Sequence, residues 1–237
     1  MNRLLPTKDV NPPASPRPLL AFLIGLLASS PLAAAQCSDL PKPSLKLQRI
    51  EEPITLDNGL GYRSLSSLGP RRLQPGSEIV GLTRGNTVVE IQTRLSIILD
   101  RRTNLECGTP EVSVSYGYRP MTVYVAREFP HGSCAYERIL EHEMRHVQVY
   151  RNHLARVEPE IAKVLQQRLD AWTIERRPPG LTSTLLRRDI HDEWIPQLRQ
   201  MIARVEDEQA QVDNEEEYRR VTTSCQGAIL NVLKASR

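Results

Sequence analysis

Aromatic side chains are scarce in this chain, and neither sign of charge dominates it. Phenylalanine, tryptophan and tyrosine make up 5% of the 237 residues, and 31 basic side chains are balanced by 28 acidic ones. Proteins that bind single-stranded nucleic acid stack bases on aromatic rings, and proteins that bind duplexes need a basic surface that follows the phosphates. We therefore expect no nucleic acid among the partners of this protein.

The sequence also lacks an apolar run long enough to span a bilayer. The longest run, residues 19–28, is about half of the ~20 residues that a membrane-spanning helix needs. It follows three basic side chains and precedes the small residues 33–35, which is the pattern of an export signal. We expect residues 1–35 to be a signal peptide. The mature chain is then secreted or periplasmic and has no stable membrane anchor.

Cysteine is limited to four residues, and they contain no C-x-x-C pair of the kind that binds structural zinc. An even number of cysteines in an exported chain favours disulfides over free thiols, although the sequence leaves three pairings open. We favour the pairings Cys37–Cys107 and Cys134–Cys225. Cys107 precedes a strand-like stretch, whereas Cys134 opens a long predicted helix and Cys225 lies near the C-terminus.

The first half of the mature chain changes in character near residue 78. Residues 36–77 are rich in Pro, Ser, Gly and charge without a sustained period, which predicts an extended or loop-like arm, or alternatively a pro-segment. Residues 78–129 are rich in Val, Ile, Thr and Tyr, which favour strands, and residues 84–86 and 118–120 are expected to form turns between the strands. We expect a small antiparallel sheet with short hairpins. The predicted strands are 78–82, 87–99, 111–118 and 121–128, of which the second also fits a helix.

Helical periodicity begins after Ser133, which can cap a helix. Apolar residues and histidines recur on one face of this helix, and Pro159 is expected to kink or restart it. The turn sequence at 177–180 ends the helix, and a last helical segment begins after residue 182 or 183. The predicted architecture of residues 78–237 is therefore an α+β domain, in which a small antiparallel sheet is followed by long packed helices.

The pattern H-E-x-x-H at residues 142–146 indicates a metal site on the first long helix. His142 and His146 are one helical turn apart on the same face, so both imidazoles can reach one zinc ion at ~2.0 to 2.1 Å. Glu143 lies beside them, where a carboxylate can take a proton from a metal-bound water and deliver it to a leaving amine. The alternative is a solvated helix face that carries the pattern by chance. Arg145 favours that alternative unless its positive charge points away from the ion.

A catalytic zinc needs a third protein ligand. His153 is eleven residues beyond His142, a rise of about 16 Å along an unbroken helix, so we expect it to pack rather than to bind the same ion. If the two long helical segments pack antiparallel around the turn, residues 142–146 lie opposite about 214–218. Glu216 is our first choice as the third ligand and Glu215 the second, with a solvated acidic face as the alternative.

The H-E-x-x-H motif, after a strand-rich segment and an export signal, resembles that of the zincin metallopeptidases. Residues 110–230 are most similar to the bacterial predicted secreted zinc-dependent proteases. The resemblance implies zinc on His142 and His146 with Glu143 as the base. The C-terminal part of that group carries Tyr, Thr and a His-Gly pair, which Tyr218 and residues 222–227 echo without a histidine. Because the histidine is missing, the resemblance does not identify the third metal ligand.

We therefore expect a zincin-like α+β domain that acts as an exported zinc-dependent hydrolase, a peptidase with a peptide or protein substrate. Tyr150 or Tyr218 would stabilise the oxyanion, and the predicted strand 121–128 would be the edge along which a peptide lies. One alternative is a non-catalytic zincin-like binding module or pseudo-enzyme of the cell envelope. Another is a structural helical hairpin held by disulfides, whose stability would not respond to chelators.

Overall fold

The computed structural model describes residues 36–69 and 78–235, which belong to the unit Ala35–Arg237. The predicted signal peptide lies outside the described residues, as does the segment 70–77. Within the described ranges, no helix combines the length and the apolar character that crossing a bilayer requires.

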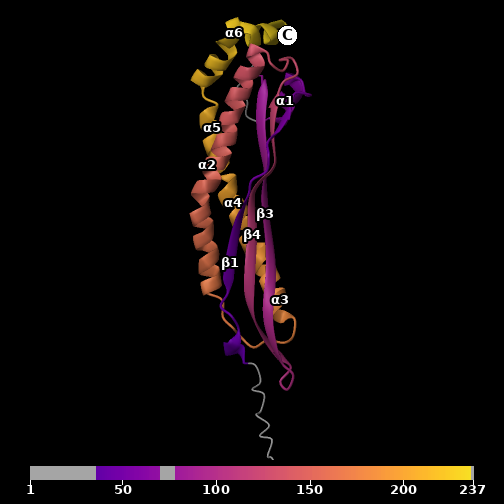
Figure 1. The fold of residues 1–237 in the computed structure, drawn as a ribbon, viewed down its shortest axis with the longest axis vertical. Coiled ribbons are helices and arrows are strands. Elements are labelled where there is room, and N and C mark those ends of the chain that lie inside the picture. Colours follow the sequence, from indigo (N-terminus) through magenta and orange to yellow (C-terminus); the bar gives the residue numbers. More distant parts are fainter. Residues whose placement is uncertain (1–35, 70–77, 236–237) are drawn as a thin grey trace, which may run out of the picture. The chain divides into compact units, whose positions relative to one another are not determined.

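Two long strands, β3 (Gly81–Asp100) and β4 (Leu105–Val125), form the hairpin on which the sheet is built (Figure 1). β3 pairs antiparallel with β4 along its whole length. On the other side of β4, β1 (Ser44–Ile50) and β2 (Thr55–Asp57) both pair in parallel with it. The sheet is therefore mixed, and β4 is its central strand.

This sheet corrects the sequence prediction of short antiparallel hairpins. The residues expected to form turns, 84–86 and 118–120, lie inside continuous strands, where they face each other across a register shift between Gly85 and Thr87. They produce one irregularity in a long hairpin because the strands continue pairing on both sides of it. The parallel pairs come from the segment 36–77, which was expected to be an arm and instead contributes two strands to the sheet.

Most of the helices follow the sheet in the chain, and the α+β prediction is confirmed. A 3₁₀ turn, Cys37–Asp39, and α1 (Tyr62–Leu68) precede the hairpin. The later helices are α2 (Cys134–Asp170), α3 (Leu181–Asp189), a π-helical turn (Ile190–Trp194), α4 (Ile195–Ala203), α5 (Val205–Val212) and α6 (Glu215–Ala235). Helix α2 begins where expected, since Ser133 Oγ accepts a hydrogen bond from the backbone N–H of Tyr136, and it continues through Pro159.

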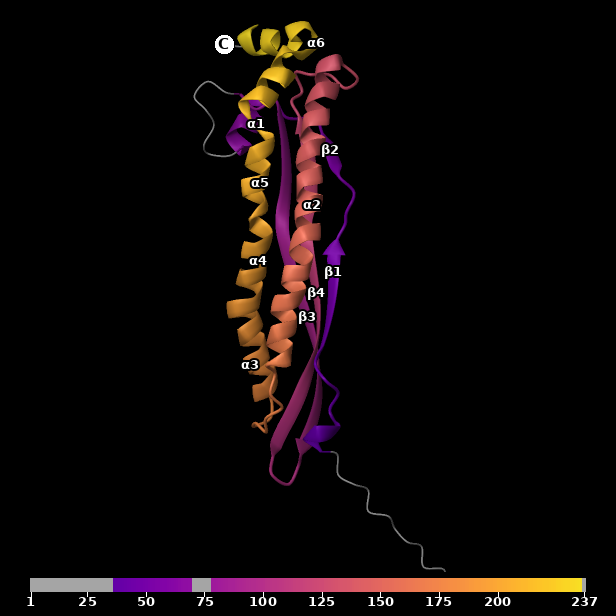
Figure 2. The ribbon, with the colours of Figure 1, turned by 90° about the vertical axis from the view of Figure 1, so that its left-hand side faces the viewer.

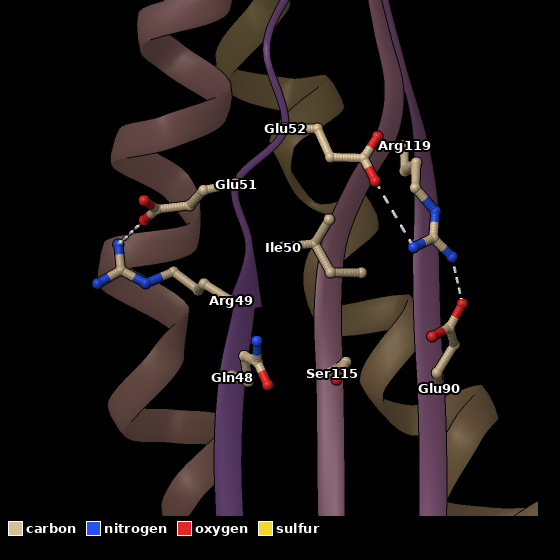
Figure 3. A pocket seen from close by; sticks show the side chains of 8 residues that line it. All are labelled: Gln48, Arg49, Ile50, Glu51, Glu52, Glu90, Ser115 and Arg119. Carbon is tan, nitrogen blue, oxygen red and sulfur yellow. Dashed lines mark hydrogen bonds and ion pairs between the residues drawn. The ribbon is translucent and has the colours of Figure 1, made fainter.

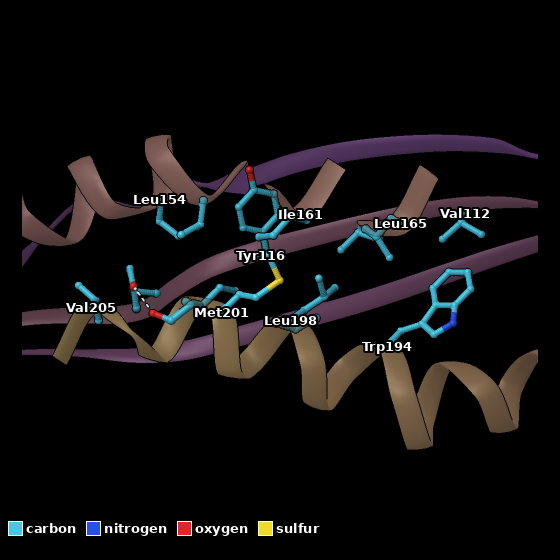
Figure 4. Packing of buried hydrophobic residues seen from close by; sticks show 14 of the residues in the cluster. Val112, Tyr116, Leu154, Ile161, Leu165, Trp194, Leu198, Met201 and Val205 are labelled. Atoms are coloured by element: carbon cyan, nitrogen blue, oxygen red, sulfur yellow. Dashed lines mark hydrogen bonds between the residues drawn. The ribbon is translucent and has the colours of Figure 1, made fainter. Parts of the chain in front are cut away.

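Helix α2 and the series α3 to α5 lie side by side over one face of the hairpin (Figure 2). Their apolar faces meet side chains that alternate along β4, such as Val112 and Tyr116, and the packing includes Leu165, Leu198 and Trp194 (Figure 4). Each of these side chains is at most 2% exposed. Burying a side chain of this size contributes roughly 1.5–3 kcal/mol, so the cluster fixes α2 and α4 relative to the sheet.

A second apolar cluster holds the first turns of α2 against α6 and the end of β4. It includes Tyr136 and Ile139 from α2, Val125 from β4, and Val221 and Ile229 from α6. The two clusters together restrain both ends of the contact between α2 and the helices that follow it.

Both favoured cysteine pairings are confirmed. Cys37 is bonded to Cys107, and Cys134 is bonded to Cys225. The second disulfide joins the first residue of α2 to α6, at residues 224–227, where the backbone of α6 leaves helical geometry. Two disulfides are compatible with an exported protein.

Candidate metal centre

The two motif histidines direct the same ring atom to one point. His142 and His146 are one turn apart on α2, and their Nε2 atoms are 3.2 Å from each other. Their side chains are 14% and 10% exposed. The helix therefore presents two nitrogen donors side by side in a largely buried position.

Asp213 brings a carboxylate oxygen to the same point. Its Oδ1 lies 3.1 Å from Nε2 of His142 and 3.0 Å from Nε2 of His146. Asp213 follows the last residue of α5 and has a non-helical backbone, with φ −86° and ψ 49°. The chain changes direction there, so this side chain reaches the histidines from the opposite helical segment.

The spacing of these three atoms fits a metal ion. Two ligand atoms bound to a tetrahedral zinc at ~2.0–2.1 Å are about 3.3 Å apart, and the observed separations of 3.0–3.2 Å are close to that value. The Asp213 side chain is 59% exposed, whereas the two histidine side chains are largely buried. His142, His146 and Asp213 could hold a metal ion.

The third ligand-type group differs from the predicted one. Glu216 is exposed, and the cluster of metal-binding atoms found among the described residues contains Asp213 in its place. The prediction assumed one continuous helix, whereas Asn214 starts a new one by accepting a hydrogen bond from the backbone N–H of Glu217 at 2.9 Å. The sequence contains a signal for this start, because an Asn followed three residues later by a Glu is typical of a helix N-terminus.

The predicted register of the two helical segments is confirmed. His142 contacts Glu217 and His146 contacts Asp213, which matches the expectation that residues 142–146 lie opposite about 214–218. The same register continues away from the motif, where His153 meets Glu208.

Arg145 has its charge partner outside the three ligand-type groups. Its guanidinium pairs with the carboxylate of Glu217, which also accepts two hydrogen bonds from Arg220, at 2.8 and 2.9 Å. These bonds from Arg220, and then the contacts with Arg145 and His142, hold the pKa of Glu217 well below its usual value although burial opposes the shift. The positive charge next to the second histidine is thus neutralised by a buried carboxylate.

Glu143 is enclosed between α2 and the start of β3. Its side chain accepts a hydrogen bond from the hydroxyl of Thr83 at 2.8 Å, and the residue is 3% exposed. A Cβ at Gly81 would lie 2.5 Å from Glu143 Oε1, so glycine at this strand position leaves room for the carboxylate. Burial raises the pKa of Glu143, although the neighbouring histidines and Thr83 oppose the rise.

The three converging groups shift one another's protonation. Burial lowers the pKa of His142 and His146, but hydrogen bonding with Asp213 and the charge of Glu143 outweigh it, so both pKa values lie above the usual 6.5. Burial raises the pKa of Asp213, but its bonds with both imidazoles outweigh that effect and hold the pKa well below 3.8. Protons and a metal ion would therefore compete for the same atoms.

The packing role expected for His153 is confirmed. The residue is 2% exposed, and its Nδ1 lies 2.7 Å from Oε1 of Glu208. Its Nε2 lies 3.2 Å from the backbone oxygen of Met201 near the end of α4. Both ring nitrogens of His153 thus have hydrogen-bond partners, and the residue lies two helical turns beyond His146.

The strand expected to be the peptide edge is not an edge. Residues 122–124 of β4 pair with β2 on one side and with β3 on the other. The strand beside the motif is instead the start of β3, whose Thr83 contacts Glu143. Of the two candidate oxyanion helpers, Tyr218 is 44% exposed, and Tyr150 packs edge-on against Tyr118 with ring centroids 4.5 Å apart.

A polar hollow of about 440 Å³ is separate from this centre. It lies where β1 ends, over β3 and β4 (Figure 3). Arg119 projects into it and pairs with Glu52 and Glu90. None of the predicted site residues lines this hollow, and its main charges already compensate one another.

Comparisons with protein-family models, with curated proteins and with solved structures find no match to this chain.

Removing one disulfide should affect metal binding, and removing the other should not. The double variant Cys134→Ser/Cys225→Ser removes the bond that ties α6 to α2. The double variant Cys37→Ser/Cys107→Ser removes a bond near the start of β4, whereas Thr83, which contacts Glu143, pairs near the end of β4. Each change should cost about 2–5 kcal/mol of unfolding free energy. Calorimetric titration with a divalent metal should show weaker binding in the first variant alone, and equal affinity in both variants would contradict the geometry.

The metal-free protein should lose stability as the pH rises through the histidine pKa values. The pKa values of both histidines are raised in the folded state. Their contribution to the free energy of unfolding is therefore complete below about pH 6.5 and is lost as the pH rises through the folded-state pKa values. The contribution of Asp213, whose pKa is depressed, is lost only in strong acid.

A bound metal should reverse this dependence, because deprotonation frees the ligand atoms. Melting temperatures measured across this pH range, with a chelator and with added metal, test the prediction. Identical chelated profiles for the wild type and Asp213→Asn would refute it.

Proposed function

We propose that the protein is an exported zinc-dependent hydrolase of the zincin type, a peptidase that acts on a peptide or protein substrate. His142, His146 and Asp213 would hold the zinc, and Glu143 would act as the general base. The observation that carries the proposal is the convergence of two imidazole nitrogens and one carboxylate oxygen within 3.0–3.2 Å of one another.

The donor set favours zinc over other common cations. Magnesium and calcium prefer oxygen ligands throughout, whereas two imidazoles with one carboxylate are typical of zinc. Three protein ligands leave one coordination position open, as in catalytic rather than structural zinc sites. Zinc in such a site lowers the pKa of the water that it binds and polarises a substrate carbonyl.

Glu143 is suited to proton transfer by its place and by its environment. It follows His142 directly on α2 and is packed against β3, so its carboxylate belongs to the same small region as both imidazoles. Burial raises its pKa towards the range in which a carboxylate can both accept and return a proton. Glu143 would take a proton from the attacking water and pass it to the leaving amine.

The start of β3 offers a place for an extended substrate. Among the described strands, β3 pairs with β4 alone, so its other edge has no strand partner there and could accept a peptide. Thr83 lies on this stretch and contacts Glu143. A peptide added along this edge would run beside the base and the metal ligands.

The enclosure of Glu143 favours a second candidate function. A base that is 3% exposed and bonded to Thr83 does not face solvent. A non-catalytic zincin-like module would keep the metal site and use Glu143 to join α2 to β3. The two functions differ in whether Glu143 is needed for cleavage or only for packing.

Three substitutions separate metal binding from catalysis. Wild-type protein should carry about one zinc per chain, and Asp213→Asn should weaken binding because it removes an anionic ligand. Glu216→Gln, a nearby exposed carboxylate, should bind zinc as tightly as wild type. Glu143→Gln should keep the zinc and lose roughly 100- to 10,000-fold in peptide cleavage.

Elemental analysis and a peptide-library cleavage assay measure these outcomes. A wild type with no more zinc than His146→Ala would contradict the metal site. Cleavage by Glu143→Gln at the wild-type rate would contradict its role as the base, and a zinc-loaded wild type that cleaves no peptide would favour the binding module.

A further inference from the structure

Each motif histidine has an acceptor at the ring nitrogen that faces away from the metal site. Nδ1 of His142 lies 3.1 Å from Oε1 of Glu217, and Nδ1 of His146 lies 2.6 Å from Oε1 of Gln209. Gln209 and Glu217 stand four residues before and four residues after Asp213. One turn of α5, the break at Asp213 and one turn of α6 therefore supply three oxygens to two histidines.

The neighbours of these acceptors determine which ring nitrogen carries the proton. The Glu217 carboxylate is paired with two arginines and has no hydrogen to donate, so the Nδ1–H of His142 is the donor. The Gln209 amide NH₂ donates to the backbone oxygen of His146 at 3.1 Å, which turns its carbonyl oxygen towards Nδ1 of His146. When both Nε2 atoms bind a metal ion, the two imidazoles then carry hydrogen on Nδ1 and donate it to these two acceptors.

In the metal-free site an Nε2–H of either histidine can donate to Asp213, whereas with both protons on Nδ1 three acceptors face one another. They are the two Nε2 lone pairs and the Asp213 oxygen, all within 3.2 Å. Lone pairs at this distance repel one another, and the low local dielectric strengthens the repulsion. A cation bound by all three atoms removes it.

We propose that Glu217 and Gln209 are positioning residues, which fix the Nδ1–H tautomer and the ring orientation of His142 and His146 so that both Nε2 atoms face the metal. This inference rests on the proposed metal site and goes beyond it, because it names residues that bind no metal and touch no substrate. Acceptors at the second nitrogen of a metal-binding histidine raise its basicity and hold its orientation, and their loss typically costs 10- to 100-fold in metal affinity.

Matched pairs of variants test the effect on affinity. Glu217→Gln should weaken zinc binding roughly 10- to 100-fold, whereas Glu216→Gln, its exposed neighbour, should not. Gln209→Leu should weaken it similarly, and the exposed Gln211→Leu should not. Affinities come from competition with a chelator, and melting curves of the metal-free variants identify any that fail to fold. Full affinity in folded Glu217→Gln and Gln209→Leu would overturn the inference.

The tautomers themselves provide a readout that a merely structural role would not move. With zinc added, NMR spectra of wild type containing ¹⁵N-labelled histidine should show His142 and His146 with hydrogen on Nδ1. Gln209→Leu should shift His146 towards the Nε2–H form and leave His142 unchanged. Hydrogen on Nε2 in the wild type would overturn the inference. Hydrogen on Nδ1 in a wild type that binds no zinc would instead refute the metal site and leave the orientation of the rings established.

Discussion

The antiparallel contact between α2 and the α5–α6 segment is the constraint on which the candidate metal centre depends. Cys134–Cys225, His142–Glu217 and His146–Asp213 all belong to one register, because each step forward along α2 matches an equal step backward along the other segment. Apolar packing holds this register from both ends, with one cluster over the sheet and another around Tyr136 and Val221. A slip of one turn would separate Asp213 from both histidines.

The break between α5 and α6 places a carboxylate beside the two motif histidines. A continuous helix would present a uniform face to α2, whereas the irregular backbone at Asp213 lets a short side chain reach between two imidazoles. Asn214 then caps α6, so Glu217 returns to the α2 side one turn later and takes up the charges of Arg145 and Arg220. The helical hydrogen bonds that are lost at this break are offset by a capping bond and by polar contacts across the interface.

The sequence was sufficient for the features that depend on regular periodicity. The helix from Ser133, the one-turn spacing of His142 and His146 and the register opposite residues 214–218 were predicted in this way. The two disulfides are the pairings that were favoured among three that the sequence leaves open. The parallel pairing of β1 and β2 was missed because it joins distant segments and leaves no local pattern. Asp213 was missed because one uninterrupted helix was assumed. A break shifts the angular position of every later residue, and Glu216 is exposed to solvent for that reason. Zinc, the peptidase activity and the likeness to zincins stay proposals, since they depend on chemistry that a fold does not determine.

Anomalous diffraction at the zinc absorption edge, from crystals grown with zinc, tests the central claim most directly. The account predicts one strong peak bound by Nε2 of His142, Nε2 of His146 and a carboxylate oxygen of Asp213, at about 2.0–2.2 Å from each. A peak at another place, ligation through Nδ1, or the absence of a peak between the two histidines would contradict it.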